Sequence, residues 1–478
     1  MSQTLHILKK DIRHLRLEIS LFLLVTAMFA FAERFLGDRL GARALLTIAS
    51  AYLIARVIHA EAVPGDNQFW ISRPYRWKSL LGAKLLFIFI FINLPILFAR
   101  LFLLVLAGFP LSSSLPGLLW SHFLILFVAS LPIAALATVT GGLVPFIFYA
   151  LVILAVVIGI QEMMMPPFSP SVRTLIDGVQ WVWDAMAAIA LSAAAIPIVC
   201  IQYKNRKTRL SRTLAITVAA LTAAAYLYVP WPAAMAVQTQ LSKRTFDTSS
   251  IHATLDPSSK LGFSAGGRSP GIELDFPIAV TGVPEAIHVE ADALAVSFQG
   301  AHGWTWKSGP YNYPALPKRI SRSGLTVFNG LVVMPRASFN QARQQSVTLR
   351  ATIYLTLFGN TRTKTVPLKN TFVNVIDGLQ CVSALGPLGD MACRSPFRWP
   401  ARVVYAKLDD SYVTPFRHSI SYSPFPADLS LDWVEFESVS RPKTARELTI
   451  ITKEPVRNLP LNFEVPNIRL ADFVEATQ

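Results

Sequence analysis

The chain has 478 residues, more than one ordinary domain needs, and 53% of them are hydrophobic while only 15% are charged. Because soluble proteins contain about 25% charged residues, this composition favours a membrane protein. The net charge of +15 could indicate nucleic-acid binding, but much of the excess lies in short loops beside apolar segments, where positive charge orients membrane proteins. Nucleic acid is therefore not an expected partner.

Residues 1–18 have the pattern of an amphipathic helix. Leu5, Leu8, Ile12, Leu15 and Ile19 recur at spacings of three and four residues. Four basic residues occupy the other positions, namely Lys9, Lys10, Arg13 and Arg16. We expect this helix to lie in the cytoplasmic interface of the bilayer, although a plain extension of the first span has the same pattern.

Seven apolar segments follow, and they predict a transmembrane domain over residues 19–236. No cleavage site for a signal peptide follows the first segment, so we expect that segment to remain in the membrane. The turn at residues 140–142 is so short that the number of spans is least secure there. The segments are residues 19–32, 42–60, 80–109, 115–139, 144–160, 179–201 and 214–229.

Charge in the connecting loops predicts the orientation. With a cytoplasmic N-terminus, the loops on that side contain thirteen basic residues and the short outer loops contain four. The cytoplasmic set is Lys9, Lys10, Arg13, Arg16, Arg73, Arg76, Lys78, Lys84, Lys204, Arg206, Lys207, Arg209 and Arg212; the outer set is Arg34, Arg39, Arg43 and Arg173. We therefore expect a multi-pass protein of the cytoplasmic (inner) membrane, with residues 245–478 outside the cytoplasm, in the periplasm if the cell is Gram-negative.

The loop between the second and third segments is the most informative part of the sequence. An acidic residue, Glu61, ends the second segment, Pro74 and Arg76 form a turn, and Gly82 with Lys84 enters the third segment. Aromatic residues suited to the headgroup layer and further basic residues lie between them, namely Trp70, Arg73, Tyr75, Trp77 and Lys78. An ordinary basic loop with interfacial aromatic residues would also have this composition.

This loop resembles the coupling loop in membrane subunits of ABC-2-type transporters, and the N-terminal helix is similar to that family's connecting helix. The resemblance covers residues 1–201, with the Pro–Arg and Gly–Lys spacings each one residue shorter than in the family, which usually has six spans. It implies that the loop docks on a separate ATP-binding subunit through Glu61, Trp70, Arg73, Pro74, Arg76, Lys78 and Lys84, and that the membrane subunits form a homodimer or a heterodimer.

Two charges inside the predicted spans form a candidate ion pair. Arg100 in the third span and Asp184 in the sixth lie at comparable depths, so we expect them to pair across the bundle. The alternative is that both face an aqueous vestibule or the outer interface. Pro95 and Pro132 predict kinks in their helices.

The second half of the sequence has the pattern of a β-rich domain. Residues 346–357 alternate strictly between apolar and polar, and residues 287–292 do the same. In residues 429–437 the apolar phase slips between Trp433 and Val434, which predicts a β-bulge. Short strands separated by turn residues favour one or two immunoglobulin-like sandwiches, with a possible break near residues 336–345.

Cysteine positions in this half predict a disulfide bond. Cys381 and Cys393 flank a turn-rich segment of the exported domain, whereas Cys200 lies in an apolar segment. Two free thiols remain the alternative in a reducing compartment. The eight histidines form no recognisable metal-binding spacing, and no G-x-S-x-G elbow is present.

These patterns favour a transport function without chemistry in this chain. The sequence has no G-x-x-x-x-G-K-[ST] phosphate loop, so we expect no enzyme activity and no cofactor here, and ATP hydrolysis would belong to the partner subunit. The leading hypothesis is the membrane subunit of an ABC-2-like transport system. The alternative is an envelope receptor or scaffold whose helices anchor the β-sandwich.

Overall fold

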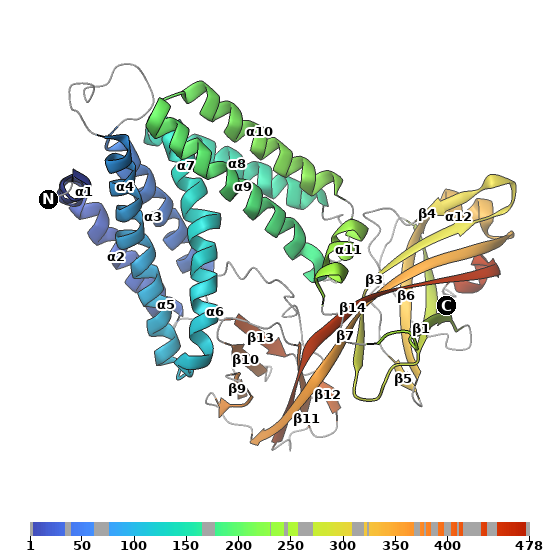
Figure 1. The fold of residues 1–478 in the computed structure, drawn as a ribbon. Coiled ribbons are helices and arrows are strands. Elements are labelled where there is room, and N and C mark those ends of the chain that lie inside the picture. The colour runs from blue at the N-terminus through green and yellow to red at the C-terminus, as the bar shows by residue number, and fades with distance from the viewer. Residues whose placement is uncertain are drawn as a thin grey trace.

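The structure is a computed structural model, and it has a helical part followed by a β-sheet part (Figure 1). The residues that it describes are 3–33, 40–61, 76–164, 177–229, 231–242, 247–256, 271–307, 320–322, 325–367, 373–376, 379–383, 391–395, 403–408, 411–413, 432–436 and 447–474.

All seven apolar segments of the sequence are helical. The helical part contains α1 (Gln3–His14), α2 (Arg16–Phe31), α3 (Leu40–His59), α4 (Trp77–Ile88), a π-helix (Phe89–Asn93), α5 (Leu94–Leu106), α6 (Leu111–Leu124), a second π-helix (Ile125–Ser130), α7 (Leu131–Val139), α8 (Leu143–Met164), α9 (Asp177–Asn205), α10 (Thr208–Tyr228) and α11 (Trp231–Leu241).

Within the described residues, four helical stretches are long and apolar enough to cross a membrane: Gly41–His59, Trp77–Leu106, Ser114–Val139 and Val182–Asn205. A fifth is possible if α1 and α2, which meet at 75°, are counted together. The apolar stretch of α8 is shorter, and α10 includes Arg209 and Arg212 in its first turns. Length and hydropathy therefore support four or five spans rather than the seven predicted.

Two of these spans are interrupted by π-helical turns directly before a proline. Proline lacks an N–H and crowds the carbonyl four residues earlier, so the local hydrogen bonding widens before Pro95 and before Pro132. Asn93 Nδ2 donates to the Ile88 carbonyl oxygen at 3.1 Å, and Ser130 Oγ donates to Asn93 Oδ1 at 3.3 Å. Each proline therefore follows a π-helical turn, and a polar contact joins the two turns; the kinks themselves stay a prediction.

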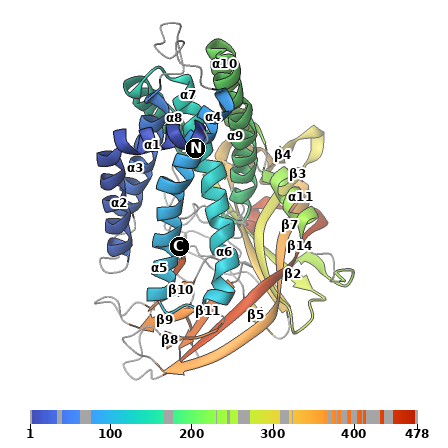
Figure 2. The same cartoon turned by 60° about the vertical axis from the view of Figure 1, so that its left-hand side comes forward.

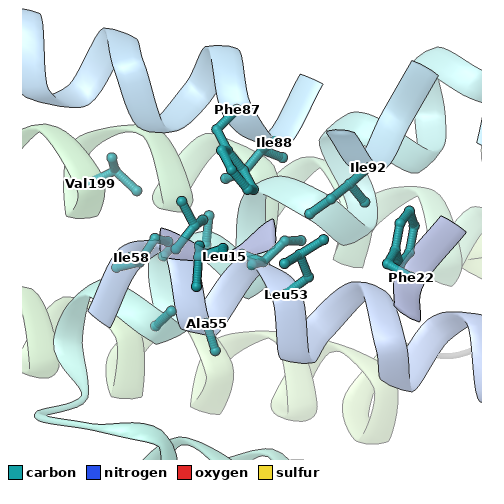
Figure 3. Packing of buried hydrophobic residues seen from close by; sticks show 14 of the residues in the cluster. Leu15, Phe22, Leu53, Ala55, Ile58, Phe87, Ile88, Ile92 and Val199 are labelled. Atoms are coloured by element: carbon teal, nitrogen blue, oxygen red, sulfur yellow. The ribbon is translucent and has the colours of Figure 1, made fainter. Parts of the chain in front are cut away.

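A hydrophobic core holds most of the helices together. Leu15, Phe22, Leu53, Phe87 and Val199 are buried in it and come from the α1–α2 junction, α2, α3, α4 and α9 (Figure 3). Because the buried α1 residues belong to this core, the N-terminal helix is part of the bundle rather than a free extension of it.

The sheet part contains β1 (His252–Leu255), β2 (Gly271–Thr281), β3 (His288–Gln299), β4 (Thr305–Lys307), β5 (Ile320–Arg322), β6 (Leu325–Pro335), α12 (Arg336–Ala342), β7 (Ser346–Pro367), β8 (Val373–Asn374), β9 (Gln380–Ser383), β10 (Met391–Ser395), β11 (Val403–Leu408), β12 (Ser411–Val413), β13 (Asp432–Phe436) and β14 (Glu447–Arg469). The described strands form three antiparallel sheets, with orders β1-β2-β6-β5, β13-β10-β9-β8 and β12-β11-β14-β7-β3-β4.

The alternation at residues 346–357 is confirmed by β7, whose apolar side chains are buried and whose polar side chains, except that of Thr356, are less so. Side chains of the first and third sheets share one hydrophobic core, which also contains Phe339 and Ala342 of α12. The suggested break near residues 336–345 therefore falls on a helix that is packed into a continuous core. The predicted bulge is wrong, because β13 pairs with β10 in unbroken register through Trp433 and Val434.

Among the described residues, the helical and sheet parts meet near Ala107 and near Trp183. Gln380 Nε2 of β9 donates to the Ala107 carbonyl oxygen at the end of α5, at 2.7 Å. Tyr354 of β7 packs on a small cluster that contains Trp183 of α9 and Met235 of α11. Both contacts lie at the end of the bundle away from α1, where α5 approaches β9 and β10 (Figure 2) and α11 approaches β14 (Figure 1). We call this the sheet end and the other the α1 end.

Candidate functional site

At the α1 end, the apolar face of the N-terminal helix includes a carboxylate. Residues four apart lie on the same face of a helix, so Asp11 stands between Ile7 and Leu15. Ile7 and Leu15 are almost completely buried, and Asp11 is 0% exposed. A carboxylate in such a place needs a cationic partner, because burying an unpaired charge is very costly.

Lys84 of α4 supplies that partner. Its Nζ lies 2.8 Å from Asp11 Oδ2 and 3.4 Å from Glu61 Oε2, and the residue is 1% exposed. Lys10 Nζ also pairs with Glu61, at Oε1. We call these four residues, Lys10, Asp11, Glu61 and Lys84, the buried charge cluster. Its two positive and two negative charges balance.

The electrostatics of Glu61 follow from this geometry. Burial favours the protonated form, but Lys84 and Lys10 outweigh that effect and hold the pKa of Glu61 below its ordinary value. Glu61 is therefore ionised at neutral pH. The contacts of Glu61 with Lys10 and Lys84 are therefore charge-assisted, whereas at Asp11 burial outweighs Lys84 and raises the pKa of the carboxyl group.

The other end of the α3–α4 loop is also attached to α1. The Arg76 backbone N–H, at the N-cap of α4, donates to Gln3 Oε1 at 3.2 Å. Lys78 Nζ lies 5.8 Å from the ring centroid of Trp77. Glu61 and Arg76 delimit the loop, so α1 contacts both of the points at which the chain enters and leaves it. Any displacement of the loop would act on α1 and α4 together.

A second polar layer fixes the α7–α8 turn beside the cluster. His59 Nε2 lies 2.9 Å from the Ala137 carbonyl oxygen and 3.1 Å from Thr140 Oγ1. Arg212 Nε of α10 donates to the Val139 carbonyl oxygen at 3.0 Å. These side chains satisfy carbonyl groups that have no partner within α7 because the helix ends there. They also join α3, α7 and α10 at the α1 end.

The structure brings three of the predicted site residues together: Lys10, Glu61 and Lys84. Lys9, Arg13 and Arg16 are exposed on α1 and at the start of α2, and Lys78 is exposed on α4. The predicted coupling residues Trp70, Arg73 and Pro74 lie outside the described residues. Sequence reasoning missed Asp11, although an acidic residue at the four-residue spacing of the apolar stripe was the available signal.

The predicted Arg100–Asp184 pair stays a prediction. Arg100 is 1% exposed, and its Nη2 donates to Ser121 Oγ of α6 at 2.7 Å. Asp184 lies on the exposed side of α9. Among the described elements, α5 packs chiefly on α2 and α6, whereas α9 packs on α4, α7, α10 and α11.

Cys381 and Cys393 occupy directly opposite positions on the neighbouring strands β9 and β10. This register places their side chains on the same face of the sheet. Cys200 of α9 is a free, half-buried thiol. The register therefore permits a bond between the two sulfur atoms.

Comparison with known proteins identifies no relative: no protein-family model, no curated protein and no solved structure matches the chain. Among the described residues, no group of three or more His, Cys, Asp or Glu side chains is placed to hold a metal ion. The function has to be argued from the geometry of the chain itself.

Proposed function

We propose that this chain is the membrane subunit of an ABC-2-like transport system that works with a separate ATP-binding subunit. The observation that carries the proposal is the buried charge cluster, which fixes the N-terminal amphipathic helix to both sides of the α3–α4 loop. A loop that only joined two anchoring helices would not need buried ionic contacts, which are costly to assemble.

The cluster suggests how such a subunit would work. Closure of the ATP-binding subunits would push on the α3–α4 loop, and Lys84 would transmit that displacement to α4 while Lys10 and Asp11 carried α1 with it. Because α4 continues through a π-turn into α5, the movement would reach the sheet end, where Ala107 accepts its hydrogen bond from Gln380. The sheets would receive or release the substrate there.

Orientation and span number belong to the same proposal. We place the α1 end in the cytoplasm and the sheets outside it, in the periplasm of a Gram-negative cell, because the α1-end loops are rich in Lys and Arg. We also propose that α8 and α10 cross the membrane, giving seven spans. The two sheets that share a core would form an immunoglobulin-like sandwich.

We further propose that Cys381 and Cys393 form a disulfide bond across β9 and β10, as their register permits. Mass spectrometry of the alkylated, non-reduced protein would show one peptide pair linked through these residues. Alkylation of both cysteines without prior reduction would contradict the bond, and with it the oxidising location of the sheets.

Co-purification tests the transport proposal. The protein would be extracted in mild detergent and its stable partners identified by mass spectrometry. We compare the wild type with an Arg76→Glu/Lys78→Glu variant at the start of α4, where the α3–α4 loop ends. The matched control is Lys204→Glu/Lys207→Glu at the exposed junction of α9 and α10, which has the same change in charge.

A partner with a phosphate-loop ATPase sequence, lost in the first variant and retained in the control, would support the proposal and locate the docking site. Recovery of envelope proteins alone, unchanged in both variants, would contradict it. That second result would favour the receptor or scaffold hypothesis and move the function to the sheets.

A further inference from the structure

Helix α6 presents a polar stripe to its neighbours and an apolar face to its surroundings. Its buried positions include the polar residues Ser114, Ser121 and His122, together with Gly117, Leu118 and Leu124. Its exposed positions are large and hydrophobic: Leu115, Leu119, Trp120 and Phe123. This is the reverse of a soluble helix. It is the pattern of a membrane helix whose inner face has a function beyond packing.

A cation that is as deeply buried as Lys84 faces this stripe. Arg100 of α5 is 1% exposed and donates from Nη2 to Ser121 Oγ at 2.7 Å. Ser121 Oγ in turn donates to the Leu118 carbonyl oxygen at 3.0 Å, so the hydroxyl is held in one orientation. A guanidinium inside a membrane helix pair is energetically costly and typically marks a ligand or ion pathway.

His122, next along α6, supplies the independent observation. His122 is 7% exposed, and neither its Nδ1 nor its Nε2 atom has a hydrogen-bond partner within the part of the chain that the structure describes. Buried polar atoms are bonded in the large majority of cases, so an imidazole with two unsatisfied nitrogens points to a group that is bound there in the working protein.

We propose that Arg100, Ser121 and His122 form a binding site for a phosphate group in the half of the bundle nearer the sheets. The planar guanidinium fork suits the oxygens of a phosphate, and the imidazole can add a further donor. The phosphate is either the headgroup of an anionic lipid or a free ion. The site goes beyond the proposed transport function, because it requires no ATP-binding partner.

The sheets contact the end of α5 that lies about two turns beyond Arg100. Ala107 is the C-cap of α5 at the sheet end, and its carbonyl oxygen accepts a hydrogen bond from Gln380 Nε2. Gln380 Nε2 also donates to Asn374 Oδ1 at 2.9 Å. Ser114 lies on α6 between this contact and Ser121. Between Ser114 and Ser121 on the same face, Leu118 is 0% exposed and packs with Leu104 and Ala107, so an apolar contact separates the site from the sheets.

The test measures binding directly on the full chain in detergent. Native mass spectrometry would count phosphatidylglycerol retained by the wild type, with phosphatidylcholine as the neutral comparison, and a separate titration would use inorganic phosphate. NMR spectroscopy of the protein with nitrogen-15-labelled histidine provides the second readout. The imidazole signal that is missing from the spectrum of His122→Gln belongs to His122, and ligand binding should shift that signal in the wild type.

We expect Arg100→Gln and His122→Gln each to weaken binding about tenfold or more, the loss that follows from removing a charge-assisted hydrogen bond. The matched control is Arg56→Gln, because Arg56 is also an arginine within a candidate span, near the end of α3, and pairs with Glu18 at 3.0 Å. The control should bind as the wild type does. If Arg100→Gln does not fold, His122→Gln and the wild-type histidine signal still decide the question.

Retention of phosphatidylglycerol identifies a lipid headgroup as the ligand, and saturation by inorganic phosphate identifies a free ion; either supports the proposal. The proposal of a phosphate site is overturned if the wild type binds neither phosphatidylglycerol nor inorganic phosphate, or if the NMR signal of His122 does not move on binding. It is also overturned if Arg56→Gln loses binding as strongly as Arg100→Gln and His122→Gln.

Discussion

Replacing Lys84 with methionine would leave the Asp11 carboxylate without its cation. Asp11 is 0% exposed and its Oδ2 lies 2.8 Å from Lys84 Nζ, so no water can take the place of the ammonium group without repacking α1. Glu61 would lose its 3.4 Å contact but would keep Lys10. The destabilisation should therefore come mainly from Asp11.

Removing one partner of a buried ion pair costs about 3–5 kcal/mol, whereas replacing both partners with apolar residues is often neutral or stabilising. We expect Lys84→Met to lower the free energy of unfolding by an amount in that range. The double variant Asp11→Leu/Lys84→Met should recover most of the loss, because a leucine at residue 11 continues the apolar stripe of Ile7 and Leu15.

Chemical or thermal unfolding in detergent measures these differences. The control is Arg56→Met, which breaks the more exposed Arg56–Glu18 pair and should cost about 1 kcal/mol or less. The reasoning fails if Lys84→Met is no more destabilised than the control. It also fails if the double variant is as unstable as Lys84→Met alone, because the loss would then come from packing rather than from an unpaired charge.

Three further outcomes are expected. Burial favours protonated Glu61, but two lysines outweigh that effect and hold the pKa of Glu61 low. The contribution of ionised Glu61 to stability is therefore complete at pH values above the ordinary pKa of 4.5 and is lost as the pH falls through the lowered pKa. The thermal midpoint of Glu61→Gln should consequently fall less on acidification than that of the wild type. Gly282 has φ +76°, and a Cβ there would lie 1.7 Å from the Ser250 carbonyl oxygen. Gly282→Ala should therefore destabilise the sheets by about 2 kcal/mol or more in thermal unfolding. The control Gly303→Ala, which has the same φ but no neighbouring atom within 4 Å of the added Cβ, should cost about 1 kcal/mol. Asn93→Ala removes two hydrogen bonds at the π-turns and should cost about 1–2 kcal/mol in the same assay, while Asn93→Asp should be worse because it places a charge in the membrane.

The helices were predictable because an apolar segment long enough to cross a bilayer has to form its backbone hydrogen bonds within itself, as a helix does. Such a segment can therefore be identified without knowing what it packs against. Whether each helix is a span was not predictable to the same degree. In α10, Arg209 and Arg212 stand close to many small and polar residues, so the helix forms but its hydropathy is low. The π-turns were foreseen only as kinks, because a proline marks where a helix is disturbed and not how its hydrogen bonds rearrange.

The candidate site was predictable in part. Glu61 and Lys84 were singled out from a resemblance to the coupling loop, and the structure joins them. Asp11 was missed because its contact with Lys84 is long-range, and helical spacing alone does not say which neighbour an acidic residue will meet. The phase slip at Trp433 was misread as a bulge, since apolar residues on both faces of a short strand give the same pattern as a slipped register.

Strands β7 and β14 pair along almost their whole length, from Ser346–Arg469 at one end to Pro367–Glu447 at the other. β14 lies between β11 and β7 in the middle of its sheet, although it follows both in the sequence. During synthesis β7 must therefore wait with one open edge until β14 has emerged. If the sheets fold outside the cytoplasm, this order exposes an unpaired strand to neighbouring chains throughout export. In a cell, a periplasmic chaperone could cover this open edge. If this half of the chain is refolded by itself, its folding should be slow and sensitive to protein concentration.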